Sequence, residues 1–159
     1  MTDKSQPLPL VFSFRELVIG NGFIASVQMS GRALMDEDDE TWITAIAPVG
    51  FSGGGAERTE AFAAFRRTWF EILVDIASDS EDFPTFKREC ESFLMGTQDD
   101  LTEDWNQALA FVRENGVTDE RLRTASADEH RVSFSVDEIR PEQFAPDKNA
   151  LDTGMRPAA

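Results

Sequence analysis

The N-terminal third of the chain contains three β-rich runs, and the second of them alternates apolar and polar positions in part, the period typical of half-buried β-strands. The first run covers residues 8–19 and ends at residues 20–22, a Gly-Asn-Gly triplet that tolerates the backbone of a tight reversal. The second run covers residues 23–35. The third, residues 41–48, is apolar enough to lie in the middle of a sheet. We therefore expect an antiparallel β-meander.

A long helix is predicted for residues 56–77, because apolar residues recur there at steps of three and four. The residues that share this face are Phe62, Phe65, Trp69, Ile72 and Ile76. We expect the face to pack on the sheet, since the other side of the helix carries charged residues. The glycine-rich residues 50–55 that precede the helix are interpreted as a flexible connection.

Shorter patterns predict the remaining elements. A second helix is expected to begin near Pro84, which a first helical turn tolerates, and to end near Gly96. A third helix fits residues 102–114 and a short fourth helix residues 118–124, each opening with Thr followed by acids. Strict alternation in residues 132–136 predicts a fourth strand.

These elements define an α+β fold. We expect an antiparallel sheet of three to four strands, packed by one long amphipathic helix and by additional C-terminal helices. The length of 159 residues suits one domain, which we place at residues 1–145. Residues 146–159 carry Pro, Gly and charge without an apolar period, so a flexible tail is expected there.

The charge of the chain indicates what kind of partner it has. Thirty Asp and Glu residues against fifteen Lys and Arg give a net charge of -15 and a pI near 4.3. Such a surface repels phosphate backbones and anionic lipids, so neither direct nucleic-acid binding nor membrane binding is expected. The net charge exceeds the roughly 2 to 8 units that solubility requires, which favours a basic protein partner.

The chain has few residues for metal or thiol chemistry. One cysteine, Cys90, cannot form an intramolecular disulfide, and one histidine, His130, cannot complete a zinc site with it. No stretch reaches the roughly 20 apolar residues of a membrane span. We expect a cytoplasmic protein without metal, cofactor or catalytic residues, in which Cys90 lies on the apolar face of the second helix and is buried.

Two acidic clusters are the candidate partner-binding residues. Residues 36–40 form a run of five acids, which is expected to be an exposed turn because burying those charges would cost too much free energy. The second cluster lies where the third helix begins. The candidates are Asp36, Glu37, Asp38, Asp39, Glu40, Asp99, Asp100, Glu103 and Asp104.

One arrangement of residues has a counterpart in a known family. An apolar strand at residues 42–48 is followed by a turn that contains Gly50 and Gly55, and then by a helix that opens with Glu-Ala at residues 60–61. This arrangement, over residues 33–73, resembles the HicB-like antitoxins.

The resemblance implies a partial ribonuclease-H-like fold that lacks the acidic metal site of true ribonucleases. It also implies a non-catalytic role, because such antitoxins sequester a small basic toxin, often the ribonuclease HicA. Glu57 stands where the family has a capping Thr, and the C-terminal half is acidic where family members commonly carry a DNA-binding domain. We therefore expect an antitoxin-like or immunity-like inhibitor that occludes a basic toxin or nuclease, without autorepression through DNA.

Three alternatives stay open. A phage or mobile-element inhibitor could mimic the charge of nucleic acid against a defence enzyme. Gly53, Gly54 and Gly55 could hold the anion of a phosphorylated substrate through backbone N–H groups, although the Lys of a P-loop is missing. An assembly subunit could form homo-oligomers through a sheet edge.

Overall fold

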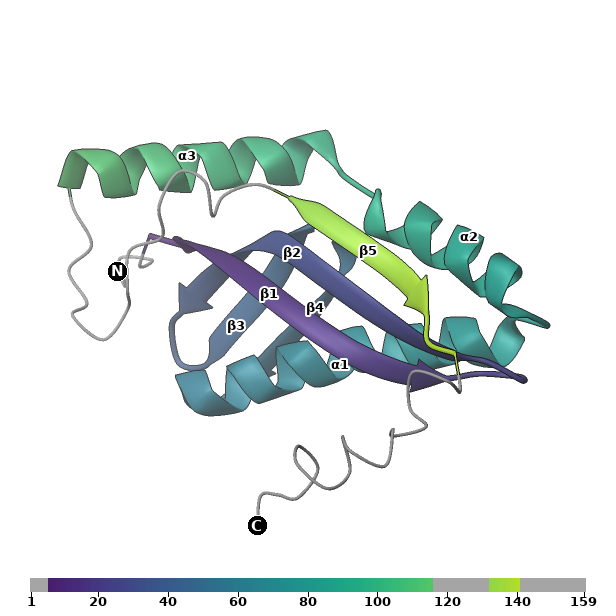
Figure 1. The fold of residues 1–159 in the computed structure, drawn as a ribbon. Helices are drawn as coiled ribbons and strands as arrows, with labels where there is room; N and C mark the ends of the chain where they lie inside the picture. Colours follow the sequence, from purple (N-terminus) through teal and green to yellow (C-terminus); the bar gives the residue numbers. More distant parts are fainter. Residues whose placement is uncertain (1–5, 116–131, 141–159) are drawn as a thin grey trace, which may run out of the picture.

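The computed structural model describes residues 6–115 and 132–140, and these form an α+β fold with one antiparallel sheet and three helices (Figure 1). The elements in chain order are β1 (Leu8–Ile19), β2 (Ile24–Glu37), β3 (Thr41–Ala47), β4 (Val49–Gly55), α1 (Arg58–Asp79), α2 (Phe83–Leu94), α3 (Asp99–Asn115) and β5 (Ser133–Glu138). The expected fold class is therefore confirmed. The 22-residue α1 is the predicted long helix.

The strand β2 is the centre of the sheet. Residues 24–35 of β2 pair with β1, while the other side of β2 is divided between two strands. Residues 32–37 of β2 pair with β3, and residues 25–30 pair with β5, which comes from the far end of the described chain. The strand order β1-β2-β3-β4 is thus a meander, as expected, with β5 added beside β3.

The β1–β2 hairpin closes at the predicted Gly-Asn-Gly triplet. Gly20 donates its backbone N–H to the carbonyl oxygen of Phe23 at 2.9 Å, which leaves a two-residue loop. Gly22 has φ 76°, in the left-handed region that favours glycine. This short loop fixes the register of both long strands.

The prediction of a flexible connection at residues 50–55 is wrong, because Val49–Gly55 forms strand β4. Glycines are rare in strands, but here they allow α1 to lie directly on the backbone of β4. An added Cβ at Gly53 would come within 2.2 Å of the backbone nitrogen of Phe65. The two strands β3 and β4 are joined through the cis Ala47–Pro48 peptide.

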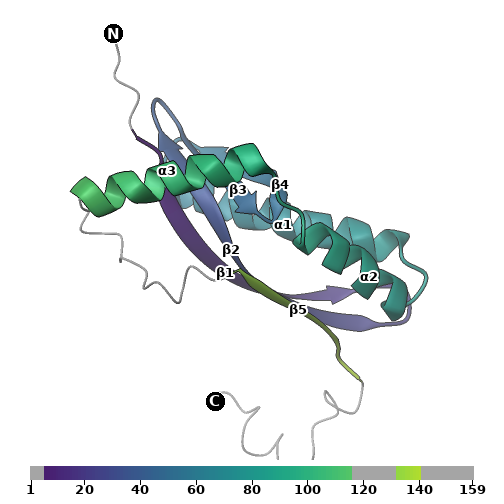
Figure 2. The same cartoon turned by 90° about the horizontal axis from the view of Figure 1, so that it is seen from above.

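Helices cover both faces of the sheet. α1 and α2 share one core with residues of all five strands, which include Phe51 and Val136. α3 crosses the opposite face near the start of β1 (Figure 2), where Trp105 packs with Leu34 and Ile46. Arg32 extends over the indole of Trp105, with its guanidinium carbon 4.5 Å from the ring centre.

The buried face of α1 overlaps the predicted one: Phe65 and Trp69 lie in the core as expected, but Phe62 does not. Its fully buried residues are Ala61, Phe65, Trp69, Leu73 and Ala77. Phe62 is 40% exposed, while Ile72 and Ile76 are only half-buried. The small residues at positions 61 and 77 face the sheet because the helix lies so close to it, and this close approach turns bulky Phe62 outward.

The later elements follow the predictions with shifted ends. α2 begins beside Pro84 and ends at Leu94 as expected, but α3 begins at Asp99, three residues before the predicted Thr102. The hydroxyl of Thr102 donates to the carbonyl of Gln98 inside the first turn, so it is not the cap. The predicted helix at residues 118–124 and the predicted tail, residues 146–159, lie outside the described residues.

Candidate functional site

The acidic run at residues 36–40 divides between a strand and a turn. Asp36 and Glu37 still belong to β2, so the turn consists of Asp38, Asp39 and Glu40 alone. The backbone N–H of Asp38 donates to the carbonyl oxygen of Glu40 at 3.1 Å and holds this turn closed. All of the run is exposed except Glu37, which is half-buried, so the expected exposed turn is confirmed for residues 38–40.

Glu37 faces away from the rest of the run, because successive side chains of a strand point to opposite faces. Its Oε1 accepts a hydrogen bond from Nε of Arg58 at 2.9 Å, and a second N–H of the same guanidinium binds the same oxygen. Glu37 therefore ties the end of β2 to the start of α1. It does not share a surface with Asp36.

Asp36 lines a concavity of about 370 Å³ between the sheet and α3. Its polar lining includes Thr44 of β3 and Asp104 and Gln107 of α3, and its floor contains Leu34 and Ile46. We name this hollow the acidic concavity. It brings together one acid from each of the two predicted clusters, although they are far apart in the sequence.

Trp42 stands next to the acidic concavity. It pairs directly with Asp36 across the β2–β3 ladder, and alternation places its side chain on the same face as Thr44. The indole lies over Gly54 of β4, where an added Cβ would come within 2.5 Å of the ring. Nevertheless 47% of Trp42 is exposed, and its Nε1–H donates to Oε2 of Glu40 at 3.3 Å.

Trp42 is the residue that the sequence interpretation missed. It belongs to the apolar run at residues 41–48, which is predicted to lie in the middle of the sheet, where an indole is normally covered on both sides. The signal that could have identified it is the alternation Thr41, Trp42, Ile43, which puts Trp42 on the face opposite to Ile43. That face is open here because only glycine lies beside the indole on β4.

The predicted acids of α3 separate into two groups. Asp104 lines the acidic concavity, whereas Asp99, Asp100 and Glu103 are exposed and do not line it. Asp99 and Asp100 occupy the first turn of the helix, where negative charge is stabilised by the helix dipole. Their position therefore has a structural explanation within α3 itself.

Gly53, Gly54 and Gly55 do not form an anion cradle. All three belong to β4, and they are packed by the backbone of α1 or by Trp42. The backbone N–H of Ala56, which an anion would use, donates to Oε2 of Glu60 at 3.0 Å. These glycines serve close packing, which leaves no space above them for a phosphate.

Thiol chemistry has no support at Cys90. The side chain is fully buried on α2, and burial, followed by the negative charges of Glu91 and Glu89, raises the pKa of the thiol to about 12. A thiol with such a pKa is protonated and unreactive at neutral pH. His130 lies outside the described residues.

Carboxylates and one indole are therefore the chemical groups of this site. Within the described residues, His, Cys, Asp and Glu side chains form no group of three that could hold a metal ion. No helix of that same part of the chain is long and apolar enough to cross a membrane. Carboxylates attract ammonium and guanidinium groups, and an exposed indole face adds cation–π attraction. Comparison with protein-family models, with curated proteins and with solved structures found no match to this chain.

Proposed function

We propose that this chain is a non-catalytic binding protein whose acidic face around Trp42 docks a basic protein and occludes it. The observation that carries the proposal is Trp42, 47% exposed, with Asp36 opposite it on β2 and Glu40 bonded to its indole. Exposed Trp residues are enriched at the centres of interfaces, and charges around them steer the partner. A Lys or Arg side chain would meet both groups at once.

The acidic concavity supports the same proposal. It is open to solvent beside Trp42, and Asp36 and Asp104 on its walls would pair with a second basic side chain. The net charge of -15 would speed encounter with a positively charged partner, most strongly at low salt. Occlusion needs no bond to be made or broken.

The resemblance to HicB-like antitoxins suggests the identity of the partner. A small basic toxin or nuclease whose nucleic-acid site is blocked by this face is the partner class we propose. If the partner is instead a defence enzyme that acts on DNA, the chain is an inhibitor that mimics the charge of nucleic acid.

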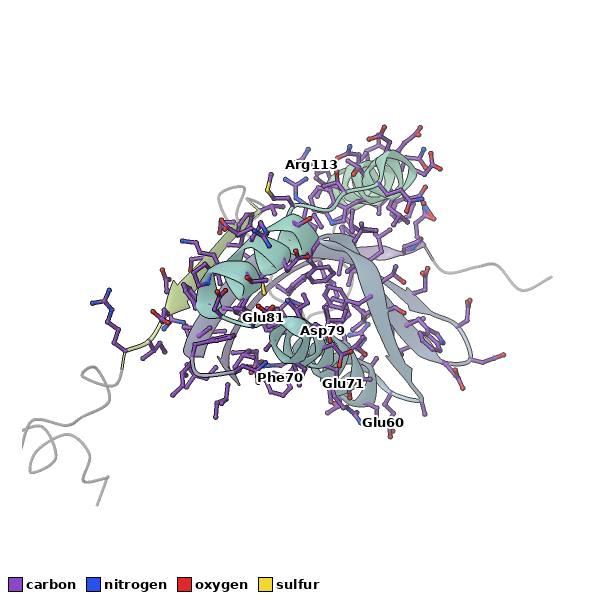
Figure 3. The ribbon with its side chains drawn as sticks, turned by 90° about the vertical axis from the view of Figure 1, so that its right-hand side faces the viewer. Glu60, Phe70, Glu71, Asp79, Glu81 and Arg113 are labelled. Atoms are coloured by element: carbon purple, nitrogen blue, oxygen red, sulfur yellow. The ribbon has the colours of Figure 1, made fainter. Side chains whose placement is uncertain are left out.

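The test compares capture by three immobilised forms of the full chain in lysate of the native host. The first is the unchanged chain, and the second carries Asp36→Asn, Asp38→Asn, Asp39→Asn and Glu40→Gln, with Glu37 kept because it holds Arg58. The third is a matched control with Glu71→Gln, Asp75→Asn, Asp79→Asn and Glu81→Gln, which removes equal charge from exposed positions in and just after α1. Figure 3 shows Glu71 and Asp79 on that helix, well apart from Arg113 of α3.

A basic protein retained by the unchanged chain and the control, but lost from the acidic-face variant, is the expected result. For the purified pair, the variant should slow association and weaken its dependence on salt. Adding the chain should inhibit RNA or DNA cleavage by the captured protein. Equal retention by all three forms, or no basic protein on any of them, contradicts the proposal.

A further inference from the structure

Strand β1 forms a free edge of the sheet, since among the described residues it pairs only with β2. The two-residue loop makes Gly20 and Phe23 a hydrogen-bonded pair, so alternation turns the backbone N–H and C=O groups of odd-numbered residues in β1 away from β2. By the same rule the backbone N–H and C=O groups of Ile24 in β2 point away from β1. The carbonyl oxygen of Ile24 indeed accepts a hydrogen bond from the backbone N–H of Ile139 at 2.8 Å. Among the described residues, the outward N–H groups of Ser13, Arg15 and Leu17 and the outward carbonyls of Ser13 and Leu17 therefore have no ladder partner, while the carbonyl oxygen of Arg15 accepts from Arg66.

Beyond Pro9 near its start and the half-buried Glu16, this edge carries little of the protection that natural edge strands usually have, namely short length, inward charges and proline. β1 is 12 residues long, whereas β5 has 6 residues and is largely polar. β4, the remaining outer strand, is covered closely by α1. Two large apolar side chains near the β1 edge are exposed, Leu17 at 53% and Ile19 at 78%.

A groove of about 560 Å³ runs beside this edge, between β1 and α1. We name it the β1–α1 groove, and its lining consists of Phe14, Glu16, Phe62, Ala63, Arg66, Arg67 and Phe70. The lining is mostly apolar, with one acid and two guanidinium groups. It therefore combines free backbone pairing groups with an apolar surface and charges of both signs.

Arg66 lies at the middle of the groove. Its Nε donates to Oε1 of Glu16 at 2.7 Å, its guanidinium carbon lies 5.3 Å from the ring centre of Phe14, and its Nη2 approaches the carbonyl oxygen of Arg15 at 3.4 Å. Phe62 and Phe70 lie four residues before and after it on α1, one helical turn in each direction. The two phenyl rings are therefore evenly spaced along α1 about Arg66.

We propose that the β1 edge and the β1–α1 groove form the interface between two copies of this chain, related by a two-fold axis near Phe14 and Arg66. Such an axis makes the two β1 strands antiparallel and joins the two sheets into one. The same axis places Phe62 on α1 of each copy against Phe70 on α1 of the other copy, so this contact occurs twice. The interface is therefore self-complementary in shape.

The strand register agrees with this axis. Pairing centred on Phe14 places Leu17 opposite Val11 of the second copy and Arg15 opposite Ser13 of the second copy, so no like charges are directly opposed. A register centred on Arg15 would oppose the two Arg15 side chains. Near the axis, Arg66 of each copy stays paired with Glu16 of the same copy. The two ion pairs then lie side by side with their positive and negative charges alternating.

This dimer is independent of the proposed binding function. The acidic concavity involves β3 and α3, neither of which lines the β1–α1 groove. Both acidic faces would stay open in the dimer. Failure of partner capture and failure of dimerisation are therefore separate results.

Light scattering and sedimentation equilibrium of the full chain over a range of concentrations test the proposal. The unchanged chain should approach twice the 17.7 kDa of one copy. Phe62→Lys should reduce the mass to that of one copy, because it puts a charge into the groove. Val74→Lys is the matched control, since Val74 is 36% exposed on the same helix but does not line the groove, and it should remain dimeric.

Ser13→Pro tests the strand part of the interface. Its N–H points away from β2, so proline there should remove an edge donor while the β1–β2 ladder stays intact. Unchanged circular dichroism together with a halved mass is expected. If this variant does not fold, Phe62→Lys still decides the question.

Hydrogen exchange distinguishes a second copy from other occupants of the edge. The amides of Ser13, Arg15 and Leu17 should be protected in the unchanged chain, and protection should fall in Phe62→Lys. A chain that is monomeric at all concentrations overturns the proposal. Monomers with protected edge amides also overturn it, because they would place another segment of the same chain on β1.

Discussion

Gly53 of β4 touches the backbone of Phe65 on α1 so closely that a single added carbon would lie 2.2 Å from the Phe65 nitrogen. Replacement by alanine must therefore push the helix away from the sheet, since backbone cannot move aside as a flexible side chain can. The packing of α1 on β4 depends on this glycine.

We predict that Gly53→Ala lowers the free energy of unfolding by about 3 kcal/mol, at the upper end of overpacking effects. Urea unfolding followed by circular dichroism measures the change. Ser52→Ala, a half-buried neighbour in the same strand, should change the free energy by less than about 0.5 kcal/mol. Equal stability of the two variants would show that α1 shifts without cost.

Burial of Cys90 predicts a loss of stability at alkaline pH. The folded thiol has a pKa of about 12 against 9.0 without these surroundings, so above pH 9 the unfolded chain loses its proton first. Stability contributed by the protonated thiol is complete below pH 9 and should fall by about 1.4 kcal/mol per pH unit towards pH 12. The chain has no Tyr and only three Lys, so few other groups titrate in this window.

Unfolding of Cys90→Ala at pH 8, 9, 10 and 11 is the control for this prediction. The variant should start from a lower stability, because it leaves a small cavity, but lose less as the pH rises. A thiol reagent should modify the unchanged chain only after denaturation. Parallel pH curves for the two proteins would contradict the assigned cause.

Docking of α3 depends on Trp105, which is 2% exposed and packs with Leu34 and Ile46. We predict that Trp105→Ala costs about 3 kcal/mol of stability, since it deletes the largest apolar contact of this cluster. Phe111→Ala, at a residue 42% exposed on the same helix, should cost less than about 0.5 kcal/mol. Chemical denaturation measures the free energy of unfolding of both variants. Similar losses in the two would show that Trp105 is not the main contact between α3 and the sheet.

Asp82 caps α2, and its effect should depend on acid pH. Oδ1 accepts from the backbone N–H of Thr85 at 2.9 Å, and hydrogen bonds from Thr85, through its side chain first and then its backbone, lower the pKa of Asp82 below 3.8. Its stabilisation is therefore present above pH 3.8 and is lost as the pH falls through the lowered pKa. The melting temperature of Asp82→Ala should therefore lie below that of the unchanged chain at pH 6, and the difference between the two should be smaller at pH 2.

Asp82→Asn separates the cap from its charge. Asn caps helices without titrating, so this variant should melt close to the unchanged chain at pH 6. Its melting temperature should fall less steeply on acidification. If the difference in melting temperature between Asp82→Ala and the unchanged chain does not change with pH, the charge of the Asp82 carboxylate does not contribute to the cap.

Local signals account for what the sequence analysis predicted correctly. Gly22 needs positive φ, Pro84 suits a first turn, and strict alternation marked β5, so each of these elements depends on neighbouring residues alone. The missed features depend on distant contacts. Gly53 is a strand residue through its pairing with Ile43 of β3 and lies against α1, and the exposure of Phe62 depends on which face of α1 meets the sheet.

The candidate site shows the same division. Exposure of Asp38 to Glu40 follows from charge alone, whereas the separation of Glu37 from Asp36 requires the register of β2 and the position of Arg58. Asp104 could be chosen among its acidic neighbours only after α3 was placed over the sheet. Sequence thus indicated the chemistry of the face, and the fold determined which residues share it.

The division of one side of β2 between β3 and β5 sets an order of events during synthesis on the ribosome. The first four strands and α1 emerge early, but residues 25–30 of β2 have no neighbour on that side until residues 133–138 are made. A nascent chain therefore carries an incomplete sheet for most of its translation. A chaperone that shields this half-strand would act before β5 arrives.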